Sequence, residues 1–440
     1  MASNREILEA QRFNRSRMTT AFTSGMPGGR EMEPHSPLTP LIVGIVLTAV
    51  LIAVALVMHK FSPGLPDGWQ NNYVLVIKDT GARYYTIDGI MHPVTNITSA
   101  KLLTPAGSFN LAEVPESKVV GIPRGPQVGL PGAPDDVPAP SALTKDPWTA
   151  CGMSESSTST WIGGAPDGLA ATTNVLVANQ GDLYLVVDGV RYPIVGETAA
   201  TLTTLDLVDA AQHPVRADWL NVTTPGTPLA PLEINGAGQP TDGMPVALAS
   251  AVVGSLVNVA HDGAITHYVV VDARHIVQLT DIAYALYELG TGANTDLIGQ
   301  PITATLADVA ALVMPNPGTI PPDWPTSMGA LLPASSMPCL QRDMTTGTVA
   351  LLSTDVASAN AVNVPGGAAA LVEVTNGGTL GTLRLISDNG YTYGIGGDIT
   401  DTLARLGYST DDIIAVPEPW AGLAQASNPS APLLSPESVQ

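Results

Sequence analysis

The run from Leu41 to Met58 reads LIVGIVLTAVLIAVALVM and holds eighteen residues without a charge. As a helix it would be about 27 Å long, close to the hydrocarbon thickness of a bilayer. In lipid, a helix is the only form in which a lone segment satisfies its backbone hydrogen bonds. A buried core helix would be polar on one face, and a cleaved signal peptide would begin near residue 1. The run therefore predicts a retained single-pass transmembrane helix over 41–58.

The basic residues near this run predict its orientation. Residues 1–40 contain five arginines, whereas Lys60, Lys78 and Arg83 are the only basic residues between positions 59 and 100. The excess of positive charge places the N-terminal segment in the cytoplasm and the bulk of the chain outside. The first 58 residues hold five of the 18 basic and four of the 39 acidic residues, which leaves 13 basic and 35 acidic residues beyond them. So acidic a surface repels polyanions, which excludes nucleic-acid binding.

Cys151 and Cys339 are the two cysteines, and both lie on the predicted outer side. A metal site needs more ligands close by, and no CxxC pair is present. In an oxidising compartment an isolated pair is most simply a disulfide, with two unrelated free thiols as the alternative. Closing so long a loop would stabilise the fold by about 4–5 kcal/mol in the chain-entropy description.

The most informative pattern beyond the apolar run is an internal repeat. YYTIDGIMHPV from Tyr84 and YLVVDGVRYPI from Tyr184 place their Asp-Gly pairs one hundred positions apart. Each predicts a strand, a two-residue turn with positive φ and a second strand. The turn residues are Asp88 and Gly89 in the first copy and Asp188 and Gly189 in the second.

Two divergent copies follow the first two. YVVVDARHIVQL from Tyr268 carries Ala273 in place of the turn glycine, and LRLISDNGYTYGI from Leu383 has a turn with Asp388 and Gly390. Each of the first two copies is preceded by a further strand, and all four are followed by a short helical stretch, near 98–103, 198–202, 280–289 and 400–406. The unit is predicted to be a three-stranded meander plus a helix.

The N-terminal segment predicts a short amphipathic helix. Ser3 and Glu6 have the spacing of a capping box, apolar residues alternate with arginines, and the run Pro27 to Gly29 would end the helix. Such a helix would lie on the membrane or dock on a partner, with a solvated tail as the alternative.

The remaining stretches are connectors and a central domain. Pro123 to Pro147 and Pro315 to Pro325 predict extended, semi-rigid spacers. Residues 135–173 and 325–375 contain both cysteines and apolar strands at 348–352 and 368–374, which favours one β-rich domain joined by the disulfide. The Ser/Pro/Ala-rich end from Ala424 predicts disorder.

No motif here specifies a catalyst, so no catalytic residue, cofactor or metal is predicted. The phosphate loop, the zinc-protease His motif and the nucleophile elbow are absent. The run Gly394 to Gly397 lacks the basic residue and long helix of a phosphate site. Asp88 and Asp188 precede glycines, where Asp serves turn geometry rather than acid–base chemistry. The sequence also has a cluster that we expect to be turn and strand-surface residues, with a metal site as the alternative: His261, Asp262, His267, Asp272 and His275.

Taken together, these segments resemble the EccB family, the single-span component of the actinobacterial type VII (ESX) secretion membrane complex. The resemblance rests on Gln11-Arg12-Phe13 through Arg17 and Ala21-Phe22, the single span, the repeats, the two cysteines and the prolyl stretch Val120 to Pro123 and Gly129 to Pro134. It covers nearly the whole chain.

The resemblance implies an α+β, mainly β fold: a cytoplasmic helix, one transmembrane helix and four small meander/helix repeats around a disulfide-bonded core. The implied domains are the cytoplasmic segment 1–40, the span 41–58, repeat 1 at 59–134, the first core segment at 135–173, repeat 2 at 174–240, repeat 3 at 241–324, the second core segment at 325–375, repeat 4 at 376–423 and the tail 424–440.

The implied function is a structural subunit in the bacterial plasma membrane, with its bulk in the periplasm-like space. It would assemble with EccC, EccD, EccE and the mycosin protease, and with further copies of itself through its outer domain. The cytoplasmic contact residues would be Arg12, Phe13, Arg15 and Arg17. Family members are often called ATPases, but this sequence shows no residues for that role. An extracytoplasmic ATP hydrolase and a tethered cell-wall binding module are the alternative functions.

Overall fold

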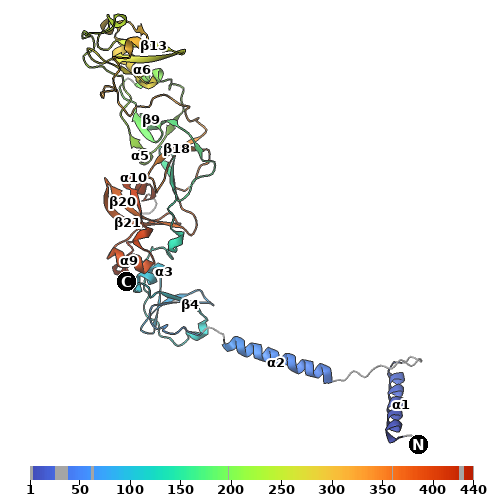
Figure 1. Ribbon diagram of the computed structural model, residues 1–440. Coiled ribbons are helices and arrows are strands. Elements are labelled where there is room, and N and C mark those ends of the chain that lie inside the picture. Colours follow the sequence, from blue (N-terminus) through green and yellow to red (C-terminus); the bar gives the residue numbers. More distant parts are fainter. Residues whose placement is uncertain are drawn as a thin grey trace. The chain divides into compact units, whose positions relative to one another are not determined.

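The computed structural model describes residues 3–24, 38–60, 64–196, 198–358, 360–425 and 431–439. The chain divides into two compact units, Met1–Pro66 and Asp67–Gln440 (Figure 1). The first unit holds two helices, α1 (Asn4–Ser24) and α2 (Leu38–Lys60). Within the described residues, no helix combines the length and apolarity that a membrane crossing requires.

Helix α1 begins next to the pair that the sequence marks as a cap. The Ser3 backbone N–H donates to Glu6 Oε2 at 2.9 Å, which satisfies a donor at the helix start. The run Pro27 to Gly29, expected to end this helix, lies outside the described residues.

Four small sheets of the second unit share one strand order. In each, two antiparallel hairpins are followed by a short helix and a strand that pairs parallel with the first strand. The first sheet is β1 (Tyr73–Ile77), β2 (Arg83–Ile87), β3 (Ile90–Pro93) and β4 (Asn110–Val114), with helix α3 (Ile97–Leu103). The second sheet is β8 (Asn174–Asn179), β9 (Asp182–Val187), β10 (Val190–Pro193) and β11 (Gln212–Pro214), with α4 (Thr198–Thr204); β12 (Thr224–Pro225) extends it after α5 (Ala217–Asn221).

The other two sheets follow the same plan. The third sheet is β13 (Leu256–His261), β14 (Ala264–Val270), β15 (Ile276–Gln278) and β16 (Ile302–Ala304), with α6 (Asp281–Leu289), α7 (Thr295–Ile298) and α8 (Leu306–Val309). The fourth sheet is β20 (Ala369–Asn376), β21 (Thr379–Ser387), β22 (Thr392–Gly394) and β23 (Ile414–Pro417), with α9 (Ile399–Leu406) and α10 (Glu418–Gln425).

The parallel fourth strand is an addition to the three-stranded meander expected from sequence. In the first sheet its residues read NLAEV and in the second QHP, so neither shows a long alternating pattern. These strands form because the edge of β1 or β8 offers unpaired backbone groups, which a short segment satisfies by pairing.

A further segment returns to the third strand of each sheet. In three sheets, one residue of the returning segment donates a backbone hydrogen bond to the sheet and accepts another from it. Three isolated β-bridges lie at these residues. The N–H groups of Val128, Leu229 and Leu434 donate to the carbonyls of Pro93, Pro193 and Gly394 at 2.9, 2.8 and 2.8 Å. In the third sheet, the Met314 N–H donates to the carbonyl of Ile276, the first residue of β15, at 3.1 Å. We call these the return segments: 123–130, 224–229, 312–314 and 433–435.

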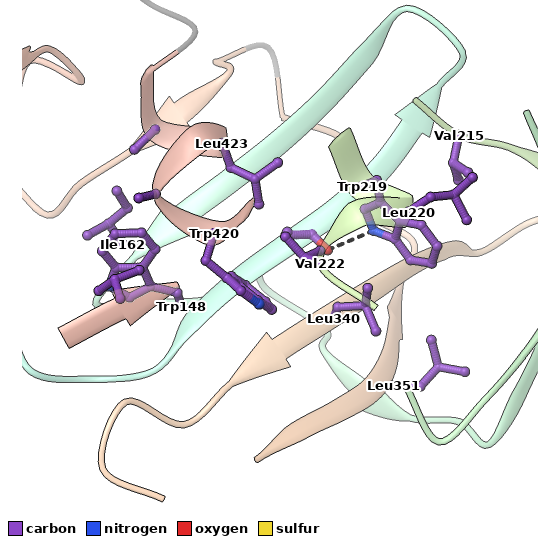
Figure 2. Close-up of a cluster of buried hydrophobic side chains, with 14 of the residues drawn as sticks. Trp148, Ile162, Val215, Trp219, Leu220, Val222, Leu340, Leu351, Trp420 and Leu423 are labelled. Carbon is purple, nitrogen blue, oxygen red and sulfur yellow. Dashed lines mark hydrogen bonds between the residues drawn. The ribbon is translucent and has the colours of Figure 1, made fainter. Parts of the chain in front are cut away.

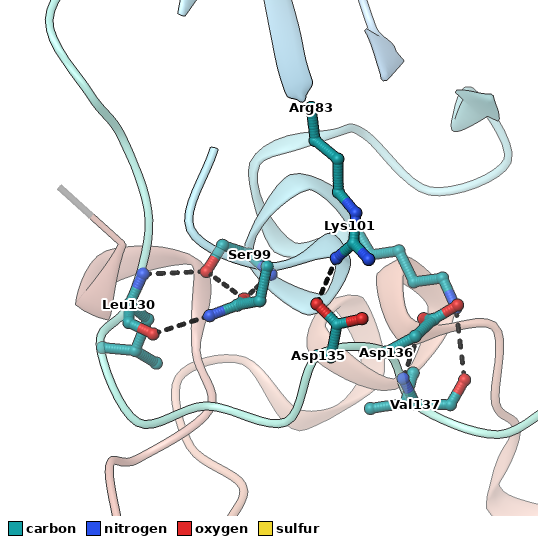
Figure 3. Close-up of polar contacts among 8 residues, drawn as sticks. Arg83, Ser99, Lys101, Leu130, Asp135, Asp136 and Val137 are labelled. Carbon is teal, nitrogen blue, oxygen red and sulfur yellow. Dashed lines mark hydrogen bonds and ion pairs between the residues drawn. The ribbon is translucent and has the colours of Figure 1, made fainter. Parts of the chain in front are cut away.

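The return segments correct two expectations. Residues 123–147 are not a free spacer, because their first half runs along β3. Asn96 Nδ2 donates to the Leu130 carbonyl at 2.9 Å. The carboxylates of Asp135 and Asp136 pair with Arg83 and Lys101, respectively (Figure 3). The 315–325 stretch is likewise packed, with Ile320 and Trp324 buried.

The second expectation that the structure corrects concerns the end of the chain. Disorder was expected from Ala424, but residues 431–439 are placed against the fourth sheet, and the Leu434 side chain is fully buried. Burying one leucine and pairing its backbone outweighs a composition that otherwise favours disorder.

The central sheet joins two distant stretches of the chain. Its strands are β5 (Trp148–Ser154), β6 (Ser157–Ile162), β7 (Ala170–Ala171), β17 (Met337–Arg342), β18 (Val349–Thr354) and β19 (Val362–Asn363), in the order β19-β6-β5-β17-β18-β7. The strand expected here at 368–374 belongs instead to the fourth sheet, where β20 pairs with β21 and β23. Its buried face packs there because β21 supplies an adjacent hairpin partner.

The short helices connect neighbouring sheets. Helix α3 packs against α9, and α4 packs against α6, so the first sheet adjoins the fourth and the second adjoins the third. Arg405 of α9 reinforces the first contact by donating to the carbonyls of Leu102 and Thr104 at 3.0 and 3.3 Å. Carbonyls at the end of α3 lack partners within their own helix, so the guanidinium satisfies them.

Candidate functional site, the disulfide-linked sheet and its pocket

The two cysteines lie opposite each other at the centre of the central sheet. Cys151 on β5 and Cys339 on β17 form an antiparallel pair, and their sulfurs are bonded. Both are fully buried. The sequence prediction of a disulfide is therefore confirmed, and the bond joins segments that are 188 positions apart.

Three tryptophans cover this sheet from different elements (Figure 2). Trp148 lies on β5, Trp219 on α5 and Trp420 on α10, and all are nearly or fully buried. The Trp219 indole N–H donates to the Ala150 carbonyl at 3.0 Å. The second sheet, the central sheet and the fourth sheet thus share one apolar core, and large buried aromatic surfaces hold it together.

A pocket of about 370 Å³ opens beside this core. Its walls come from the turn after β9, the residues after α5, the turn between β17 and β18, and the start of α10. Val222, Pro419 and Trp420 supply apolar surface, while Asp188 and Arg342 are its charged lining residues. The second, central and fourth sheets therefore meet at this pocket.

Arg342 has no acidic partner among the described residues. Its Nη1 donates to the Gly347 carbonyl at 2.8 Å, which holds the guanidinium against the turn. Its Nε is buried and meets no acceptor in the described stretches of the chain. Burial without a neighbouring negative charge lowers the pKa of Arg342. Arg342 is not among the residues that the sequence predicts to be functional, and its only signal in the sequence is the scarcity of basic residues beyond residue 58.

The Asp-Gly turns have the backbone geometry that a tight hairpin requires. Asp88 and Gly89 have φ of 48° and 75°, and Asp188 and Gly189 have φ of 47° and 82°. Gly390 has φ of 76°, in a longer turn that also contains Asp388. In the third copy the chain from Val271 to His275 forms a wider loop, where Asp272 Oδ1 accepts from two backbone N–H groups.

These turns differ in what they touch. A Cβ on Gly189 would lie 3.2 Å from the Val349 carbonyl oxygen of β18, and one on Gly390 would lie 3.3 Å from the Val362 carbonyl oxygen of β19. The turns of the second and fourth sheets therefore pack on the central sheet. The Gly89 N–H instead donates to the Gln70 carbonyl at 2.9 Å, within the first repeat.

The residues that the resemblance implies as cytoplasmic contacts all lie on α1 with exposed side chains. Arg12 and Arg15 are three residues apart and share one face, while Phe13 and Arg17 are four apart and share a nearly opposite face. The Phe13 side chain is 51 % exposed. The helix thus presents a mixed basic and apolar surface.

The histidines of the third sheet are dispersed. His261 contacts Asp262 at 3.3 Å, His275 contacts Asp272 at 2.9 Å, and the His267 ring stacks on Tyr284 with centroids 3.8 Å apart. In the described residues, no three His, Cys, Asp or Glu side chains are grouped as a metal site would need.

The Gly394–Gly397 run faces protein, not an open cradle. A Cβ on Gly396 would lie 2.6 Å from Leu433 Cδ2, and one on Gly397 would lie 2.6 Å from Glu437 Oε2. The small residues make room for the return segment, and the acidic side chain beside them opposes a phosphate.

Comparison with known proteins identifies the family of this chain. The family described as Type VII secretion system ESX-1, transport TM domain B matches residues 1–341 and 321–439. The chain belongs to the EccB family. This EccB-family chain is 28 % identical over 445 residues to the ESX-3 secretion system ATPase EccB3 of Mycolicibacterium smegmatis, covering 86 % of this chain and 80 % of the relative.

Other relatives match over shorter stretches. The ESX-1 secretion system ATPase EccB1 of Mycobacterium tuberculosis is 29 % identical, over 52 % of this chain and 50 % of its own length. The ESX-5 secretion system ATPase EccB5 of Mycobacterium tuberculosis is 28 % identical, over 48 % of this chain and 44 % of its own length. These alignments therefore span half or less of those proteins.

Solved structures share the fold. A chain in the intact ESX-5 inner membrane complex matches with a TM-score of 0.65 and 20 % identity, covering all of this chain and 95 % of that one. A chain of the EccB3 dimer from the ESX-3 core complex matches with a TM-score of 0.64 and 24 % identity, covering 83 % of this chain and 98 % of that one. The expected α+β, mainly β fold is confirmed.

Proposed function

We propose that this chain is a structural subunit of a type VII secretion membrane complex, anchored by one membrane-spanning helix with α1 in the cytoplasm. The family match over both ends of the chain carries the proposal. The structures of similar fold are described as an ESX-5 inner membrane complex, its periplasmic assembly and an EccB3 dimer. The four sheets serve as four copies of one module, fixed around the disulfide-linked central sheet.

The membrane anchor in this proposal is α2. Its central residues include the uncharged run from Leu41, and the side chains described there are exposed to solvent when the unit is taken by itself. Such a helix leaves its apolar surface without a partner in water, whereas lipid covers it.

The partners in this proposal are the other membrane subunits (EccC, EccD, EccE and the mycosin protease) and further copies of the chain. The exposed basic and apolar surface of α1 is the proposed cytoplasmic contact, through Arg12, Phe13, Arg15 and Arg17. Charged groups spread over a helix face favour docking on an acidic partner over burial in a core.

Co-purification tests this proposal. Tagged chain extracted gently from membranes should bring the other membrane subunits with it, and deletion of residues 1–40 should abolish this. The triple variant R12E/R15E/R17E should act like the deletion, and R5E on the same helix is the matched control. Full recovery of the subunits by the deleted chain would count against the scaffold role, provided that non-reducing electrophoresis shows the Cys151–Cys339 bond intact.

Accessibility to a thiol reagent tests the orientation. A membrane-impermeant maleimide applied to intact cells should label S156C, an exposed position in the turn after β5, and should not label S16C on α1. Labelling of S16C alone would reverse the proposed topology.

Hydrolysis of ATP is the second candidate function, favoured by the names of the relatives. The Gly-rich run offers little support, because Leu433 and Glu437 occupy the space beside it. Phosphate release by the purified chain, compared with the G396V variant, tests the activity at this position. An equal rate of phosphate release by the unmodified chain and by G396V would assign the hydrolysis to another position or to a contaminant.

A further inference from the structure

The pocket beside the central sheet is lined by Arg342, whose guanidinium pairs with no acidic side chain among the described residues. The outer region holds 35 acidic and 13 basic residues, yet none of the described acidic side chains pairs with Arg342. By contrast, Arg83, Lys101, Arg216, Arg274 and Arg405 each contact an aspartate. A half-buried guanidinium whose Nη2 meets no described acceptor retains capacity for a carboxylate ligand.

We propose that this pocket binds a carboxylate carried by a peptide segment of a partner protein, with Arg342 as its anchor. The inference rests on the proposed function only in taking the peptide from a neighbouring subunit. The guanidinium is held by Gly347, so little side-chain freedom is lost when a ligand binds.

The other walls favour a peptide over a bare anion. Asp188, exposed at the turn after β9, also lines the pocket and accepts hydrogen bonds but repels an ion that carries only negative charge. A peptide supplies both groups, a carboxylate for Arg342 and a backbone N–H for Asp188. Trp420 and Val222 add apolar surface that a peptide side chain or its stem covers.

The size of the pocket also limits its ligand. Ligand sites span about 300–1,000 Å³, so a pocket of 370 Å³ lies at the small end of this range and accommodates only a short part of a chain-like ligand. The pocket is formed by turns from three packed sheets, which are already in place before the ligand arrives. Such a site selects by charge and shape at low cost in ordering.

Peptide binding to the purified full-length chain in detergent tests the proposal. The probes are acetyl-Ala-Ala-Asp-Ala-amide and its Asn counterpart, followed by Trp indole NMR signals, with inorganic phosphate as a third ligand. The Asp peptide should shift the Trp420 signal, and the Asn peptide should bind roughly tenfold more weakly or not at all. A peptide with a free terminal carboxylate, compared with its amide, distinguishes a chain end from an acidic side chain as the source.

Two variants locate the effect. R342Q removes the guanidinium, and N221D places a carboxylate in the lining by an isosteric change that breaks no described hydrogen bond; each should weaken the Asp peptide by about tenfold. N14D, on an exposed residue of α1 outside the pocket with no described side-chain hydrogen bond, is the matched control. Should R342Q fail to fold, N221D carries the test.

The proposal is overturned if the Asp and Asn peptides bind equally, if neither binds, if phosphate binds as well as the Asp peptide, or if N221D binds like the unmodified chain. Because these are measurements on one purified protein, they can fail while co-purification succeeds, and the reverse also holds.

Discussion

His213 is a buried imidazole in a chain whose other described histidines are more exposed. It lies on β11 with 7 % of its surface accessible, and its Nε2 is 3.2 Å from the Leu332 carbonyl oxygen. Burial disfavours the charged imidazolium and lowers the pKa of His213, against a smaller opposite effect of the Leu332 carbonyl. The residue ties the second sheet to the segment that enters the central sheet, a role that its position in the sequence does not reveal.

This depressed pKa predicts a pH-dependent stability. Above the ordinary histidine pKa of 6.5 the contribution of neutral His213 is fully present; as pH falls through 6.5 toward the lower folded-state pKa, the unfolded chain binds the proton first and stability is lost. The H213Q variant should therefore lose less stability than the unmodified chain between pH 7 and pH 5 in urea unfolding. H261Q, at an exposed histidine, controls for loss of an imidazole, and parallel profiles for H213Q and the unmodified chain would contradict the prediction.

At the scale of elements, local patterns predicted the hairpins and helices better than the pieces that complete each sheet. Thr280 caps α6 through a bond from the Ala283 N–H, as a Thr before an apolar run indicates. The return segments escaped prediction because they are short, contain or adjoin prolines, and pair with the sheet at only a few residues. Their signal is one buried apolar residue among prolines, such as Leu229 or Leu434.

The last return segment gives a matched pair for mutation. Leu434 is fully buried and bonds to Gly394 and Gly396, whereas the neighbouring Leu433 is 50 % exposed. We expect L434A to lower the free energy of unfolding by about 2–5 kcal/mol, because it leaves a cavity in the core of the fourth sheet. L433A should cost less than about 1 kcal/mol. Equal effects in chemical denaturation would show that residues 431–439 do not stabilise the sheet.

At the scale of the whole chain, the central sheet is where distant segments meet. In the sequence, β5 precedes the second sheet and β17 follows the third sheet. The pairing of Cys151 with Cys339 fixes the register of these two strands. The buried tryptophans of α5 and α10 then attach the second and fourth sheets to it. Rigid attachment of small sheets, each with little core of its own, suits a scaffold.

Removal of the disulfide should therefore weaken the entire second unit. For the C151S/C339S variant of the full-length chain we expect the free energy of unfolding to fall by about 4–5 kcal/mol, because the unfolded chain regains the freedom of a long loop. Urea unfolding followed by tryptophan fluorescence measures the loss. A reducing agent should lower the stability of the unmodified chain and leave the variant unchanged; insensitivity of the unmodified chain would contradict this role.

The sequence by itself determined the family, the mainly β class, the cysteine pair and the positions of the Asp-Gly hairpins. These features depend on residues that are neighbours in the chain, or on the chemistry of a single pair, so local rules reach them. Only the tertiary structure decided that NLAEV joins β1, that 369–376 leaves the central sheet for the fourth, that the prolyl segments return to their sheets, and that Arg342 lines a pocket without pairing with a described acidic side chain. Each of these depends on which distant surfaces meet, and that choice is made by the burial and hydrogen bonding of the complete fold, which no short stretch of sequence contains.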